Sequence, residues 1–156
     1  MFTYNIQLAG YDYSQYDEKG KTDITNFLQV IEQFPWIEQL EKYDQLQQGC
    51  SATVSAVDHT TNTVLWVSAA AEGDSYNYLK GDSHHYLIGY VYPKTIKGFL
   101  GLGAEKVKRW VDIYITDDFN LVKELFTLFF SGHTIMLQQK LSGEEKYQSM
   151  ASKDKD

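Results

Sequence analysis

The chain has 156 residues, of which 43% are hydrophobic and 22% charged, and it has a formal net charge of −7. This length and composition predict one folded domain and exclude a disordered chain. The negative charge argues against a nucleic-acid partner, because proteins bind such polyanions mainly through lysine and arginine. The first residues lack the basic and apolar regions of a signal peptide, and no apolar run reaches about 20 residues. We therefore expect a cytoplasmic protein without membrane contact.

The first half of the chain predicts one strand followed by two helices. Apolar and polar residues alternate over 2–8, as in a strand with one buried face. Residues 11–21 have no clean period and are expected to form a loop. Apolar residues then recur at three- and four-residue spacing over 24–34, which predicts an amphipathic helix. Pro35 is expected to close this helix and to open a second one that ends at Gly49.

The second half predicts mainly strands. Short segments rich in β-branched and aromatic residues are separated by turn-forming residues, which is typical of hairpins. A wide apolar face behind two aspartates predicts a helix near the end, because negative charge is favoured at a helix N-terminus. The expected elements are strands at 50–57, 63–70, 86–92 and 108–115, a helix at 121–130, and a further turn or short helix at 135–137.

The order of these elements lacks the regular alternation of strand and helix that parallel sheets require. It predicts an α+β fold, with a mainly antiparallel sheet of about five strands and helices packed on one face. We expect a single domain over residues 1–141. The polar segment 142–156 is expected to be a frayed tail.

The negative charge is concentrated in the first half of the chain. Residues 1–78 contain 11 acidic residues and 3 lysines, a balance of −8, whereas residues 79–156 have a balance of +1. Tyrosines, which are enriched at protein interfaces, are interspersed with these acids. An acidic surface of this kind favours a basic partner, because opposite charge speeds association. The predicted partner-binding residues are Tyr11, Asp12, Tyr13, Tyr16, Asp17, Glu18, Glu41, Tyr43, Asp44, Asp74 and Tyr76.

The sequence predicts no catalytic residues, no cofactor and no metal site. Asp82, His84 and His85 are the best metal candidates, but neighbouring residues of a strand point to opposite faces and no further ligand completes a set. The glycine-rich stretch 98–103 leads into a strand, whereas a phosphate-binding fingerprint leads into a helix. The single cysteine, Cys50, is expected to be a packed, unreactive thiol.

The segment Trp110-Val-Asp-Ile-Tyr-Ile-Thr-Asp-Asp-Phe leads into a helix that carries Leu125-Phe126 and Phe129-Phe130. With this segment and its size, acidity and architecture, the chain resembles the immunity proteins of bacterial polymorphic and contact-dependent toxin systems. These are small, acidic, cytosolic α+β proteins that neutralise a toxin by binding it. The resemblance implies a non-catalytic binding protein with a basic toxin or enzyme as its partner, and it assigns no functional residues.

Two other classes of function stay open. One is a small metal- or ligand-binding enzyme domain centred on Asp82, His84 and His85. The other is a structural homo-oligomer that pairs through the loop Phe99–Leu102 or through an exposed sheet edge. The sequence leaves the oligomeric state and the strand order undetermined.

Overall fold

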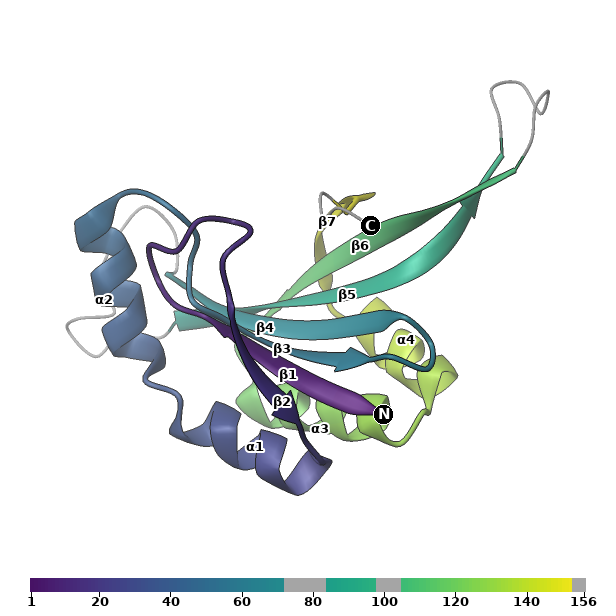
Figure 1. The fold of residues 1–156 in the computed structure, drawn as a ribbon, viewed down its shortest axis with the longest axis horizontal. Coiled ribbons are helices and arrows are strands. Elements are labelled where there is room, and N and C mark those ends of the chain that lie inside the picture. Colours follow the sequence, from purple (N-terminus) through teal and green to yellow (C-terminus); the bar gives the residue numbers. More distant parts are fainter. Residues whose placement is uncertain (72–83, 98–104, 153–156) are drawn as a thin grey trace.

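The structure, a computed structural model, describes residues 1–71, 84–97 and 105–152. These residues form one sheet and four helices (Figure 1). The strand order is β2-β1-β3-β4-β5-β6-β7, and every neighbouring pair is antiparallel. The strands are β1 (Phe2–Gln7), β2 (Asp17–Lys21), β3 (Thr53–Asp58), β4 (Thr63–Ala71), β5 (His84–Ile96), β6 (Lys106–Thr116) and β7 (Glu145–Ala151). The helices are α1 (Ile24–Gln33), α2 (Trp36–Leu46), α3 (Phe119–Phe130) and α4 (Thr134–Ser142).

The predicted α+β fold with an antiparallel sheet is confirmed, but the sheet has seven strands rather than about five. The two strands that the sequence did not predict are the edge strands β2 and β7, and almost all of their side chains are exposed. An edge strand with two solvated faces has no buried side to impose alternation, so it leaves no period-2 pattern. Part of the expected loop 11–21 and part of the expected frayed tail therefore extend the sheet.

Helix α2 ends earlier than its sequence predicted. Its last residue is Leu46, and Gln47 takes the left-handed conformation with a φ of 51°. The backbone N–H of Gln47 donates to the carbonyl of Tyr43, which closes the last turn. Gly49 also has a positive φ, but it serves the loop that follows the helix rather than the helix end.

The main hydrophobic core lies between the helices and one face of the sheet. Along β3, Val54 and Ala56 point into this core and are fully buried. Phe27 of α1 and Phe126 of α3 are also fully buried, and their ring centroids lie 4.6 Å apart. Figure 1 shows α1 and α3 beneath the same side of the sheet. Among the described residues, no helix is long and apolar enough to cross a membrane.

The other face of the sheet carries a smaller apolar cluster of Val91, Val111 and Ile113. Trp66 of β4 lies directly opposite Gly89 of β5. A Cβ atom on Gly89 would lie 1.9 Å from the Trp66 indole, so only glycine leaves room for this ring. The sheet is therefore apolar on both faces near its centre.

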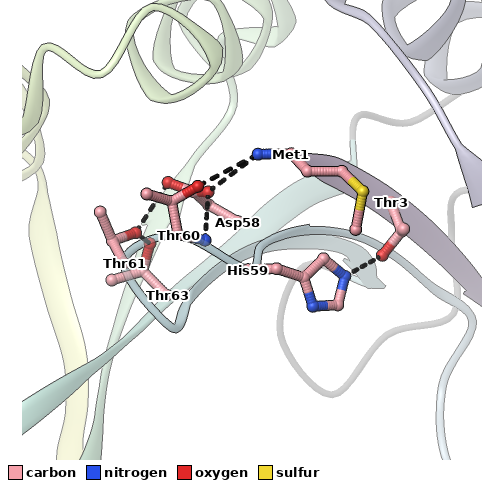
Figure 2. Close-up of polar contacts among 7 residues, drawn as sticks. All are labelled: Met1, Thr3, Asp58, His59, Thr60, Thr61 and Thr63. Atoms are coloured by element: carbon pink, nitrogen blue, oxygen red, sulfur yellow. Dashed lines mark hydrogen bonds and ion pairs between the residues drawn. The ribbon is translucent and has the colours of Figure 1, made fainter.

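The turn between β3 and β4 is organised by the carboxylate of Asp58, which is 9% exposed (Figure 2). It accepts hydrogen bonds from the backbone N–H of Thr60 at 2.9 Å and from the hydroxyl of Thr61 at 2.8 Å. The amino group of Met1 lies 3.8 Å away, and the ring of His59 contacts the hydroxyl of Thr3. This carboxylate thus holds the β3–β4 turn against the start of β1.

Replacing Asp58 by asparagine should destabilise the fold by about 1 kcal/mol at neutral pH, because a charge-assisted hydrogen bond is lost. Burial would raise the pKa of Asp58, but the bonds from Thr60 and Thr61 outweigh it, and the net pKa is lowered. A carboxyl with a lowered folded-state pKa stabilises the fold above its unfolded pKa of about 3.9, and this contribution is lost as the pH falls through the folded value.

Urea unfolding of both proteins between about pH 7 and pH 2 checks this prediction. The stability difference between wild type and Asp58→Asn should be constant near neutrality and should shrink below about pH 4. A difference that stays the same down to the lowest pH would show that the charge of Asp58 does not stabilise the turn.

Candidate functional site

The structure brings the predicted acidic, tyrosine-bearing segments of the first half together. The loop between β1 and β2 lies against the C-terminal part of α2 and the residues that follow it (Figure 1). The N–H of Gly10 donates to the carbonyl of Cys50, and the N–H of Cys50 donates to the carbonyl of Tyr11, both at 3.0 Å. The N–H of Ala9 donates to the buried side chain of Gln39 in α2 at 3.0 Å. We call residues 11–18 and 36–46 the acidic surface.

Two glycines allow this close approach of backbone to backbone. Gly10 has a φ of 86°, and a Cβ there would lie 2.5 Å from the side chain of Leu46 in α2. Gly49 has a φ of 76°, and a Cβ there would lie 2.7 Å from the carbonyl group of Gly10. Glycine adopts this left-handed conformation without strain, and at Gly49 the backbone of Gly10 and Tyr11 also leaves no room for a Cβ. These two positions fix where the loop sits on α2.

The side chain of Gln7 holds the loop from the sheet side. Its amide nitrogen lies 3.2 Å from the carbonyl oxygen of Asp12, 3.3 Å from that of Tyr13 and 3.0 Å from that of Gln15. The N–H of Gln15 also donates to the carbonyl of Asp12 at 2.9 Å. The loop is thus tied both to β1 and to itself, and its exposed side chains leave from a fixed backbone.

The acidic surface exposes tyrosine rings beside carboxylates. The side chains of Tyr13, Tyr16 and Tyr43 are 83%, 51% and 38% exposed. The half-buried Tyr11 donates its hydroxyl to Asp17 at 3.5 Å. The predicted acids divide into two groups. Asp17 and Asp44 have partners in Lys19 and Gln47, whereas the side chains of Asp12, Glu18 and Glu41 form no hydrogen bond or ion pair with the residues that the structure describes.

Net charge supports this description of the surface. Residues 11–18 and 36–46 contain six acidic residues and one lysine, a net charge of −5. The predicted residues Asp74 and Tyr76 lie outside the described part of the chain, as does the glycine-rich stretch 98–103. The surface is therefore built from the loop, the start of β2 and α2.

His84 and His85 open β5 and point to opposite faces of the sheet, as the sequence indicated. The ring of His84 lies 3.0 Å from the hydroxyl of Tyr86. Burial, and secondarily the neighbouring His85, lowers the pKa of His84. Asp82 lies outside the described residues. Within residues 1–71, 84–97 and 105–152, no three histidine, cysteine or acidic side chains are grouped so as to hold a metal ion.

Cys50 sits beneath the loop and is only 7% exposed. Burial raises the pKa of its thiol, and the charge of Asp12 adds to this effect. The thiol at neutral pH is therefore protonated, and the thiolate needed for nucleophilic chemistry is disfavoured. Cys50 packs the base of the acidic surface.

A polar cluster on β5, β6 and β7 was not singled out as a site from the sequence. Asp112 accepts hydrogen bonds from Tyr92 at 2.9 Å and from Ser149 at 2.5 Å, and Ser149 accepts one from the indole of Trp110 at 2.8 Å. Burial would raise the pKa of Asp112, but these bonds and the nearby Lys146 outweigh it and lower the pKa. The alternation over 108–115 placed Trp110 and Asp112 on one face, but no sequence pattern indicated that Ser149 of β7 is their partner.

The cluster connects three neighbouring strands through their side chains. Ser149 of β7 donates its proton to Asp112 of β6, which also accepts a hydrogen bond from Tyr92 of β5. These bonds favour the ionised form of Asp112. The cluster thus ties the three strands together.

The chain matches no protein-family model, no curated protein and no solved structure.

Proposed function

We propose that this protein is a non-catalytic, cytoplasmic binding protein, an immunity protein that neutralises a cognate bacterial toxin by binding it. The binding site is the acidic surface, and the partner carries a basic patch around the region that the contact occludes. One observation carries the proposal: the loop of residues 11–16 is held against the segment that follows α2 by reciprocal backbone bonds at Gly10, Tyr11 and Cys50.

A loop fixed in this way favours binding. Ordering a flexible loop on association costs free energy, and a loop that is already ordered avoids this cost. The bonds from Gln7 and the close packing at Gly49 fix the loop before any partner arrives. The exposed rings of Tyr13 and Tyr16 then offer contact area at little further cost in entropy.

The acids supply attraction and orientation. The carboxylates of Asp12, Glu18 and Glu41, which have no partner within residues 1–71, 84–97 and 105–152, lie on a surface with a net charge of −5. Such a surface steers a basic partner and raises its association rate. The immunity class fits these features, because its members act by occluding a toxin rather than by chemistry.

The test is a charge reversal that leaves the fold alone. The variant Asp12→Lys, Glu18→Lys, Glu41→Lys changes three side chains that make no hydrogen bond or ion pair to the described part of the chain. We expect it to weaken binding to a captured partner by at least about tenfold, or about 1.4 kcal/mol, and the loss to be larger at low salt. Tagged wild type and variant are used to capture partners from a bacterial lysate, with identification by mass and titration of the purified partner.

The matched control is the variant Asp117→Lys, Glu144→Lys, Glu145→Lys, which makes the same change in charge at positions outside residues 11–18 and 36–46. It should bind as wild type does. If both variants lost binding affinity equally, the effect would come from net charge and not from the acidic surface. A captured partner without a toxin domain would contradict the proposal. So would a partner that binds the first variant as tightly as it binds wild type.

A further inference from the structure

Strands β5 and β6 extend beyond the rest of the sheet. The last residue of β5 that pairs with β4 is Val91, and the first residue of β6 that pairs with β7 is Trp110. From Pro93 to Ile96 and from Lys106 to Lys108 the two described strands pair only with each other, whereas the carbonyl of Arg109 also accepts a hydrogen bond from the N–H of Ser152. We call residues 93–97 and 105–109 the arm, which projects from the body in Figure 1.

The arm is basic in an acidic protein. It contains five basic residues and one acidic residue, a net charge of +4, whereas the chain carries −7. The basic residues form no ion pair in the described part of the chain. The ammonium of Lys94 lies 4.0 Å from the ring centroid of Trp110, and its charge helps to lower the pKa of Asp112. The basic residues are Lys94, Lys97, Lys106, Lys108 and Arg109.

The register gathers three of these charges on one face. Lys94 lies directly opposite Lys108, and Lys106 follows two residues away on the same face, about 7 Å along the strand. Like charges directly opposite each other destabilise an antiparallel pair. Lysine and proline at a free edge also discourage strand pairing, which accounts for Pro93. Three lysines on one face also form a basic patch that suits an anionic contact.

The acidic surface is complementary to the arm. It carries a net charge of −5 and exposes the rings of Tyr13 and Tyr16, over which lysine ammonium groups bind favourably. Figure 1 shows the β1–β2 loop and α2 at the opposite end of the molecule from the arm, so an arm meets this surface only on another copy. Nucleic acid is a poorer occupant, because a net charge of −7 repels a polyanion.

We propose that the arm of one copy docks on the acidic surface of a second copy. The contact is head-to-tail, so each association leaves one arm and one acidic surface free. We expect it to be a weak, reversible association, because it rests on charges that salt screens. Because it covers the proposed toxin-binding surface, self-association competes with a partner, but it requires no partner in order to form.

Sedimentation velocity of the purified protein tests this proposal. At an ionic strength of about 0.01 M, where the Debye length is about 30 Å, the weight-average sedimentation coefficient should rise with concentration. At about 1 M salt, where the Debye length is about 3 Å, it should not. A wild-type protein that stays monomeric at every concentration in low salt would overturn the proposal.

Two charge-reversed variants identify the contact. The arm variant is Lys94→Glu, Lys106→Glu, Lys108→Glu, and the surface variant is Asp12→Lys, Glu18→Lys, Glu41→Lys. Each alone should associate at least about tenfold more weakly than wild type. An equimolar mixture should form a heterodimer, because the basic arm of the surface variant meets the intact acidic surface of the arm variant. Restored association in the mixture also shows that both variants are folded.

The alternative occupants give different results. Either variant associating alone as wild type does would place the contact elsewhere and overturn the proposal. Binding of a DNA duplex that is lost in the arm variant, without self-association of the wild type, would assign the arm to nucleic acid instead. Because only this protein is needed for sedimentation, the outcome is independent of whether a toxin is captured.

Discussion

Replacing Gly49 by alanine should destabilise the protein by about 3 kcal/mol and loosen the loop on α2. A left-handed conformation costs a non-glycine residue about 1–2 kcal/mol. The added Cβ would also lie 2.7 Å from the carbonyl group of Gly10 and 2.8 Å from the carbonyl oxygen of Tyr11. These obstacles are backbone atoms that take part in the reciprocal bonds with Cys50, so they cannot move aside without breaking them.

Gly20→Ala is the matched control. Gly20 has a φ of 82°, close to that of Gly49, but a Cβ there meets no atom within 4 Å. Urea unfolding should therefore show a loss of only about 1–2 kcal/mol for the control. The thiol of Cys50 gives a second readout, because labelling in the native state should be faster in Gly49→Ala only. Equal losses of stability in both variants would mean that the close approach to Gly10 does not affect the free energy of unfolding.

Truncating Phe27 to alanine should cost about 3–5 kcal/mol, the largest single effect that we expect. Phe27 is fully buried, and its ring lies 4.6 Å from that of Phe126, 5.4 Å from that of Phe130 and 6.1 Å from that of Tyr4. It therefore joins α1 to α3 and to β1. Removing the ring leaves a cavity that these three elements, fixed by their own packing, fill only in part.

Urea unfolding with near-ultraviolet circular dichroism measures this loss. Since small domains are stable by about 5–15 kcal/mol, Phe27→Ala is expected to shift the transition strongly or to abolish it. Phe27→Leu keeps most of the apolar volume and should cost less. Ile135→Ala, at a side chain that is 73% exposed, should stay within about 0.5 kcal/mol of wild type. A similar small loss for Phe27→Ala would place the core elsewhere.

The elements that could be predicted from sequence are those with one buried face. The alternation over 2–8 and the helical spacing over 24–34 reflect such faces, and they correspond to β1 and α1. Asp118 likewise marks the start of α3, because its carboxylate caps the first N–H groups. β2 and β7 were not predicted, because exposed edge strands pair through backbone atoms, which are the same in every sequence.

Composition located the charges of the candidate site but not its architecture. Acids and tyrosines in 11–18 and 36–46 marked an acidic surface, yet nothing local indicated that Gly10 and Gly49 meet. Net charge over half the chain also concealed the arm, since the balance of +1 over 79–156 averages its basic residues with distant acids. Pairing between strands, which depends on long-range register, was needed to place Lys94 opposite Lys108.

The three tryptophans occupy three separate environments, which makes them optical reporters of different parts of the molecule. Trp36 is 7% exposed and donates its indole N–H to the carbonyl of Ile31, so its emission follows the main core. Trp66 lies across Gly89 on the opposite face of the sheet. Trp110 lies at the base of the arm, with the ammonium of Lys94 over its ring. Any anion that draws Lys94 away changes the field on this indole, so the fluorescence of Trp110 reports arm occupancy without an added label.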